Sequence, residues 1–244
     1  MKPVPGQSDE RRIDFIVVGA QKAGTTALFE HLSDHPGIGL SDVKEIHFFD
    51  DEAFDWPAGD YGSYHRHFDW RDGRVRGEAT PIYAYWPGAM ERIRVYNPAI
   101  KLIMMLRDPV ERAWSHWRME FGRGVETHDF SWCIRQGRQR LFEASPWGHH
   151  REFSYVERGF YGDQLEAVRQ LFGPEQLLVI AAQDLQSEPT GTLGRVTEFL
   201  GVAGLDHVQS RAVHVGREMG EMSAADRDYL HAVYAADQAR LAAI

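Results

Sequence analysis

The sequence predicts a single α/β domain in which a central parallel sheet is flanked by helices. Strand-length apolar runs recur along the chain and alternate with segments of helical periodicity. These runs are apolar throughout rather than at every second residue, as expected for strands that are covered on both faces. A chain of 244 residues with 43% hydrophobic residues can bury one full core of this kind.

The first half of the chain contributes two predicted strands and two predicted helices. In order, they are a strand at residues 13–18, a helix at 25–35, a strand at 74–78 and a helix at 89–96. Leu28 and Leu32 lie on one face of the first helix, which ends at Pro36. The second helix stops before Asn97 because a residue that precedes a proline, here Pro98, disfavours the helical conformation.

The second half follows the same alternation. Its predicted elements are a strand at 101–106, helices at 110–121 and 162–172, a strand at 177–182, a helix at 192–200 and a last helix that starts within 223–226. Pro109 suits the first helical position, and Gly173 and Gly201 suit helix ends. Ser223 and Asp226 have capping-box spacing. The last helix is expected to turn Leu230, Val233, Tyr234 and Leu241 inward.

Two segments stand apart from this pattern. Residues 122–153 are rich in arginine, histidine, glycine and aromatic residues, and a loop of this length is usually functional or mobile. We interpret it as a lid or an acceptor loop within a domain spanning residues 13–244. Residues 1–12 are polar and lack a hydrophobic signal segment, so we expect a flexible leader and a cytoplasmic protein.

Composition limits the classes of partner. The formal net charge of −9 argues against nucleic acid and, more weakly, against a long polyanionic acceptor. No apolar run approaches the length of a membrane span. The one cysteine, Cys133, excludes an internal disulfide and a cysteine metal cluster, and a buried structural role is expected for it. The histidine pairs lack a clear third ligand, so we predict no metal site.

The loop Gly-Ala-Gln-Lys-Ala-Gly-Thr-Thr, residues 19–26, joins the first strand to the first helix. Its glycines allow close approach of the backbone to a ligand, and the helix N-terminus offers unpaired N–H groups. Lys22 adds a charge, and Thr25 and Thr26 add hydroxyl groups. The loop therefore predicts a phosphate site. A kinase or ATPase would instead carry Gly-Lys-Ser/Thr and a second strand ending in aspartate.

A second anion anchor follows the strand at residues 101–106. Arg107 stands at the tip of that strand, and Ser115 lies two turns into the following helix. An arginine at this position suits an anion better than a metal. Two phosphate sites without a metal motif indicate a nucleotide that carries phosphate at both ends of its ribose.

Together these segments resemble the sulfotransferases that use 3′-phosphoadenosine 5′-phosphosulfate (PAPS). The first loop resembles their 5′-phosphosulfate loop, and residues 107–115 resemble their 3′-phosphate motif. Three further stretches, Lys-Glu-Ile-His-Phe-Phe-Asp at 44–50, Glu-Ala-Thr-Pro-Ile-Tyr at 78–83 and residues 155–200, are similar to the branch of heparan sulfate N- and O-sulfotransferases and small bacterial relatives. The resemblance covers roughly residues 13–201 and implies a P-loop-like sulfotransferase fold.

The resemblance also implies roles for individual residues. PAPS is the implied donor, 3′-phosphoadenosine 5′-phosphate (PAP) the product, and no metal is required. The residues expected to hold the nucleotide are Gln21, Lys22, Ala23, Gly24, Thr25, Thr26, Arg107 and Ser115. Lys22 is expected to stabilise the leaving phosphate and Glu45 to act as the base. His47 is a second acid/base candidate or an orienter of Glu45.

The sequence departs from the family pattern at two places. The heparan-type relatives carry a lysine after the glutamate that corresponds to Glu78, whereas this chain has Ala79. The family's late Lys-Gly-Arg loop over the cofactor is not recognisable. Arg211 or Arg217 could replace it, although both could equally be solvated arginines on a loop.

Three functional readings follow. The first is a PAPS-dependent sulfotransferase that acts on a hydroxyl or amine of a small-molecule, sugar or lipid acceptor. The alternatives are a P-loop kinase that binds ATP with Mg²⁺, and a non-catalytic protein of the same fold that binds PAP or another nucleotide.

Overall fold

A computed structural model of the chain describes residues 11–204 and 220–243. The expected leader falls almost entirely outside these residues, as do Arg211 and Arg217. The five-stranded sheet has the order β2-β3-β1-β4-β5, and every neighbouring pair is parallel. The strands are β1 (Phe15–Gly19), β2 (Ile38–Leu40), β3 (Val75–Ala79), β4 (Lys101–Leu106) and β5 (Leu177–Ala181). The predicted single α/β domain with a central parallel sheet is confirmed.

Two strand predictions need correction. β2 was not predicted, because a strand of three residues is too short to show a period. β5 was expected to be fully buried, but it lies at the sheet edge and pairs only with β4. Leu177, Leu178 and Val179 are accordingly half-buried, and Ala181 is exposed.

The longer helices match the predicted positions to within a few residues. They are α1 (Thr25–Ser33), α3 (Ala89–Tyr96), α4 (Pro109–Gly122), α6 (Tyr161–Leu171), α8 (Pro189–Leu200) and α9 (Ala224–Leu241). The short helices α2 (Gly62–His65), α5 (Phe130–Cys133) and α7 (Ala182–Ser187) were not predicted. A helix of four to six residues shows less than two turns of periodicity. None of the helices within the described residues is long and apolar enough to cross a bilayer.

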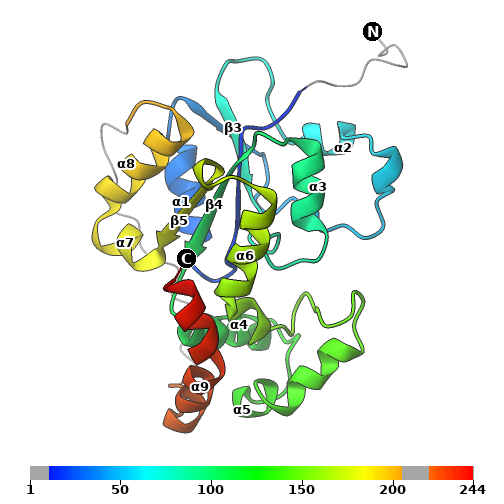
Figure 1. Ribbon diagram of the computed structural model, residues 1–244, viewed down its shortest axis with the longest axis vertical. Helices are drawn as coiled ribbons and strands as arrows, with labels where there is room; N and C mark the ends of the chain where they lie inside the picture. The colour runs from blue at the N-terminus through cyan, green and yellow to red at the C-terminus, as the bar shows by residue number, and fades with distance from the viewer. Residues whose placement is uncertain (1–10, 205–219, 244) are drawn as a thin grey trace.

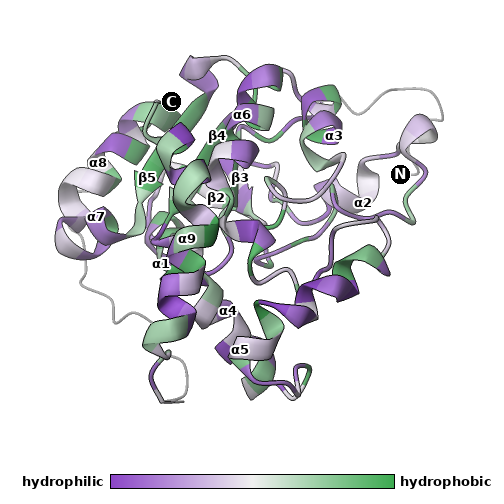
Figure 2. Cartoon of the chain, turned by 60° about the horizontal axis from the view of Figure 1, so that its bottom comes forward, coloured by the Kyte–Doolittle hydropathy of each residue, from purple (hydrophilic) through white to green (hydrophobic). Residues whose placement is uncertain are grey.

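The helices cover both faces of the sheet. In Figure 1, α1, α7 and α8 lie on one side of the strands and α3 and α6 on the other, while α4, α5 and α9 gather at one end. Figure 2 shows predominantly green, hydrophobic strands between helices that alternate between green and purple residues. This arrangement explains why the strands are apolar throughout while the helices carry one apolar face.

A second hydrophobic cluster anchors the segment that was expected to be a long loop. Phe130, Cys133 and Ile134 of this segment are buried against Val110 and Tyr234, which come from α4 and α9. The segment contains α5 and a 3₁₀ helix, Gln136–Phe142, and is therefore built into the fold over much of its length. The buried position of Cys133 confirms the structural role expected for it.

The last helix follows its sequence signals. The Ser223 hydroxyl accepts the N–H of Asp226 at 3.1 Å, which caps the first turn. Leu230 and Tyr234 are buried, as expected. Val233 and Leu241 are half-buried and pack against the two hydrophobic clusters.

Gly77 allows β1 and β3 to pack closely. It pairs with Phe15, and a Cβ atom added at residue 77 would lie 2.3 Å from the Phe15 ring. We expect Gly77→Ala to lower the free energy of unfolding by about 1–3 kcal/mol, because the ring must leave its buried position. Gly73→Ala is the control, since a Cβ atom there meets nothing within 4 Å. Equal denaturation midpoints for the two variants would contradict this account.

Candidate active site

One pocket of about 340 Å³ opens where β1, β4 and β5 end. It is lined by residues 21–27, Glu30, Glu45, Pro81, Arg107, Ser115, Met119, Arg123, Ala182 and Gln186. Ligands of open parallel sheets bind beyond the carboxyl ends of the strands, and this pocket lies at that edge. Every predicted nucleotide-binding residue within the described part of the chain lines this pocket, together with Glu45.

The loop after β1 leaves the start of α1 open to a ligand. Gly24 is the N-cap residue of α1 with a φ of 87°, and no side chain caps the helix. Glycine adopts this left-handed conformation without strain. The first N–H groups of α1 therefore have no side-chain acceptor and stand beside Thr25 and Thr26, which is the arrangement that binds phosphate at helix N-termini.

Lys22 also has a left-handed backbone, with a φ of 70°. Its Nζ lies 3.5 Å from the Met119 Sδ, so the side chain points into the pocket toward α4. Burial and the positive charges of Arg123 and Arg107 lower the pKa of Lys22. Cations that converge in this way repel one another until an anion lies between them, so their placement favours an anionic ligand.

Arg107 and the following helix form the second anchor. The Asp108 carboxylate accepts the N–H of Glu111 at 2.9 Å, and Pro109 occupies the first helical position. This cap starts α4 directly after the exposed Arg107 and aims one face of the helix into the pocket. Ser115 lies on that face, which agrees with its predicted position.

The same face of α4 carries two pocket residues that were not predicted. Ser115, Met119 and Arg123 are spaced by four residues, so they line one side of the helix and its C-terminal cap, about 6 Å apart along the axis. Arg123 is 62% exposed and is held by Glu120 at 3.3 Å. The spacing from Ser115 was visible in the sequence and is the signal that could have identified Arg123.

Glu45 reaches the pocket from the segment between β2 and β3. Its φ is 64°, a conformation that costs energy in a residue other than glycine, and its N–H donates to the Ala79 carbonyl at 3.0 Å. Burial alone would raise the pKa of the carboxyl group. The interaction with His47 and the ion pair with Lys44 outweigh burial and lower the pKa to about 2. Glu45 is therefore ionised in the unliganded protein.

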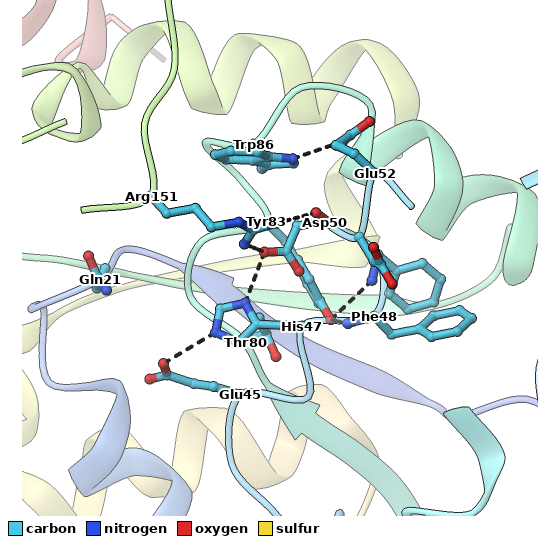
Figure 3. Close-up of polar contacts among 12 residues, drawn as sticks. Gln21, Glu45, His47, Phe48, Asp50, Glu52, Thr80, Tyr83, Trp86 and Arg151 are labelled. Carbon is cyan, nitrogen blue, oxygen red and sulfur yellow. Dashed lines mark hydrogen bonds and ion pairs between the residues drawn. The ribbon is translucent and has the colours of Figure 1, made fainter. Parts of the chain in front are cut away.

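His47 lies behind Glu45 and does not line the pocket. Its Nδ1 is 2.9 Å from the Asp50 carboxylate and its Nε2 is 3.8 Å from that of Glu45, too far for a direct hydrogen bond (Figure 3). Asp50 and Glu45 together raise the pKa of His47 to about 9, despite its partial burial. A protonated imidazole between two carboxylates fits the role of an orienter of Glu45 better than that of a second base.

The end of β3 is closed to solvent. Glu78 and Ala79 are both fully buried, and Glu78 accepts hydrogen bonds from Tyr64 at 2.8 Å and Thr80 at 2.6 Å. Burial raises the pKa of Glu78 to about 7, although these hydrogen bonds oppose the shift. Of the residues that follow Glu78, Pro81 lines the pocket and Tyr83 is buried in the core.

Among the described residues, no three His, Cys, Asp or Glu side chains converge as a metal site requires. His65 is buried and its Nε2 lies 3.0 Å from the Tyr96 hydroxyl, while His67 pairs with Asp42 at 2.7 Å. These two histidines therefore have polar partners within the fold.

Comparison with known proteins agrees with this geometry. The model of the sulfotransferase domain family matches residues 12–214. Human heparan sulfate glucosamine 3-O-sulfotransferase 3B1 is 31% identical over 205 residues, covering 81% of this chain and 48% of that protein. The chain thus spans about half the length of that relative. Human bifunctional heparan sulfate N-deacetylase/N-sulfotransferase 3 is 28% identical over 79% of this chain and 23% of its own length.

A solved structure is similar over nearly the whole molecule. The crystal structure of a sulfotransferase from Alicyclobacillus acidocaldarius superposes with a TM-score of 0.79 and 31% identity. The superposition covers 96% of this chain and 95% of that one. The likeness thus includes both the sheet and the helical end that carries α4 and α9.

Proposed function

This chain belongs to the sulfotransferase domain family, and on that premise we propose that it transfers a sulfuryl group from PAPS to an acceptor hydroxyl or amine, releasing PAP. The observation that carries the proposal is that Lys22, Arg107, Ser115 and Glu45 all line the same pocket. It combines two anion anchors and a carboxylate, which are the parts that in-line transfer from a phosphate leaving group requires.

The donor is assigned to the two anchors. Residues 21–26 hold the 5′-phosphosulfate, and Arg107 and Ser115 hold the 3′-phosphate. Lys22 stabilises the charge that develops on the leaving oxygen. Arg123, at the C-terminal cap of α4, adds a third cation to the pocket beside Lys22 and Arg107. It thus supplies from α4 a positive charge that Ala79 does not provide from β3.

Glu45 is assigned as the base. A carboxylate with a pKa of about 2 is a weak base in the unliganded protein. An anionic donor in the same pocket disfavours its charged form and raises that pKa, because like charges destabilise each other. Binding of the donor therefore strengthens the base at the step that needs it.

The acceptor is proposed to be a small molecule, a sugar or a lipid. The names of the curated relatives concern heparan sulfate, but the formal net charge of −9 on this chain disfavours a long polyanion. The segment at residues 122–153 is proposed as the acceptor loop. In support, it presents the exposed, paired rings of Phe142 and Trp147, whose centroids are 5.2 Å apart. Exposed aromatic rings are typical of surfaces that bind sugars and other partly apolar ligands.

A thermal-shift screen tests the donor assignment. We expect PAP to raise the melting temperature without added metal, and Arg107→Ala to remove most of that rise because a charge-assisted hydrogen bond to phosphate is lost. Arg195→Ala is the control, since it removes an exposed arginine on α8 that does not line the pocket. Stabilisation by ATP with Mg²⁺ alone would contradict the proposal and favour a kinase.

A transfer assay then tests the reaction. Labelled PAPS is incubated with the protein and a library of hydroxyl and amine acceptors, and labelled product is measured. Binding of PAP without transfer to any acceptor would favour the non-catalytic alternative.

A further inference from the structure

Arg151 lies near the end of the 122–153 segment and contacts Asp50, which pairs with His47 beside the proposed base Glu45. Its guanidinium donates to both the carboxylate and the backbone carbonyl of Asp50 and lies 4.4 Å from the centre of the Trp86 ring (Figure 3). The side chain is 38% exposed, whereas that of Asp50 is fully buried. A buried carboxylate requires cationic or hydrogen-bonding partners, so Arg151 and His47 together hold the charge of Asp50 inside the protein.

Asp50 transmits this contact to Glu45. One carboxylate oxygen, Oδ2, interacts with both His47 and Arg151, and His47 in turn lies between Asp50 and Glu45. Figure 3 shows Arg151, Asp50, His47 and Glu45 as a continuous row. The charged groups that face His47 within the described residues are Glu45 with its partner Lys44, and Asp50 with its partner Arg151.

A second arginine fixes the same stretch of chain to the nucleotide loop. Arg158 is 1% exposed and donates to the Gln21 side-chain oxygen and to the backbone carbonyls of His150 and Arg151. Gln21 lines the pocket. The backbone of Arg151 is thus held in place relative to the nucleotide loop, and its side chain relative to the base.

We propose that Arg151 is a positioning residue that sets the place of Glu45 through Asp50 and His47. The proposal rests on the function proposed above, because it assigns Glu45 as the base. The left-handed backbone at both Glu45 and His47 supports it, since strained conformations persist only where the surroundings hold them. Arg151 does not line the nucleotide pocket, so its removal should leave the affinity for PAP unchanged.

The test compares Arg151→Met and Arg151→Lys with a matched control. Arg74→Met removes an arginine of equal side-chain exposure, 38%, that pairs with Asp72 and lies outside both the pocket and the 122–153 segment. We expect Arg151→Met to lower kcat at least about tenfold with unchanged PAP affinity, because small displacements of a catalytic group are costly. Arg151→Lys should recover part of the rate, and Arg74→Met should match the wild type.

A double variant separates positioning from general damage. If Arg151 acts through the base, Arg151→Met should lower kcat no further when Glu45 is already glutamine. Full additivity of the two effects would overturn the proposal. So would a wild-type kcat in Arg151→Met.

A titration of His47 by ¹⁵N NMR tests the contact that His47 and Arg151 share with Asp50, and it needs neither PAPS nor an acceptor substrate. Its pKa of about 9 reflects the hydrogen bond to Asp50, and removing Arg151 leaves that carboxylate to His47 alone. The midpoint should therefore rise in Arg151→Met and stay in place in Arg74→Met. If Arg151→Met does not fold, the same comparison is made with Arg151→Lys, in which weaker pairing should give a smaller rise. An unchanged or lowered midpoint overturns the proposal, whereas absence of transfer by the wild type would overturn only the proposed function.

Discussion

Replacing Glu45 by glutamine is expected to lower kcat for sulfuryl transfer by about 10²–10⁴-fold and to leave the affinity for PAP nearly unchanged. The amide has the shape of the carboxylate but cannot accept the acceptor proton. Glu45 borders the pocket without belonging to either phosphate anchor. The loss should therefore appear in kcat rather than in nucleotide binding, as measured by transfer kinetics and by titration with PAP.

The control for this variant is Glu111→Gln. The side chains of Glu45 and Glu111 are both 35% exposed, and Glu111 pairs with Arg227 away from the pocket. A wild-type kcat in Glu45→Gln would rule out Glu45 as the base.

The dependence of the rate on pH gives a second check of the role of Glu45. Because the pKa of Glu45 is lowered to about 2, its carboxylate stays ionised down to that pH in the free enzyme. It should therefore cause no fall between pH 8 and pH 5 in kcat/KM for PAPS, which reports the free enzyme.

Replacing Lys22 by methionine should lower kcat by about 10²–10³-fold, the loss typical of removing one preorganised donor to a developing negative charge. Methionine keeps the unbranched stem of the side chain without the ammonium group and, like lysine, must adopt the left-handed backbone at this position, where φ is 70°. The change therefore removes the charge with little additional backbone strain. Binding of PAP should also weaken, because Lys22 lines the pocket beside the start of α1.

Lys22→Arg distinguishes charge from shape. It keeps the positive charge, so PAP binding should be largely retained. Its kcat should lie between those of wild type and Lys22→Met, because the planar guanidinium cannot occupy the place of the ammonium beside Met119. These outcomes are measured by PAP-induced thermal shift and by transfer kinetics. A wild-type kcat in Lys22→Met would contradict the proposal that Lys22 stabilises the charge on the leaving oxygen.

Most of the fold could be predicted because its signals are local. The strands β1 and β4 are apolar runs bounded by polar residues, and α3 and α9 carry clear start or stop residues. The three-residue strand β2 and the short helices gave no periodic signal. The partial burial of β5 depends on its place at the sheet edge, and no local pattern states which strand lies at an edge.

The candidate site was predictable where its residues follow strand ends. The Gln21–Thr26 loop, Arg107 and Ser115 come from β1, β4 and α4, and parallel strands bring their carboxyl ends to one edge. Glu45 was predicted from a motif and lies in the same pocket, while the roles of all these residues stay predictions. Arg123 was missed although its spacing from Ser115 was visible in the sequence. Arg151 was missed because an arginine in a polar segment does not show which residues it contacts.

The sequence by itself therefore determined the sheet, the phosphate loop and the family, since each depends on neighbours within a few residues along the chain. Only the tertiary structure decided which cations surround Lys22 and what holds Glu45. Those contacts join Lys22 to α4, and Asp50 to Arg151 across about a hundred residues. Electrostatic energies depend on distance through space and on burial, neither of which can be read from the order of residues.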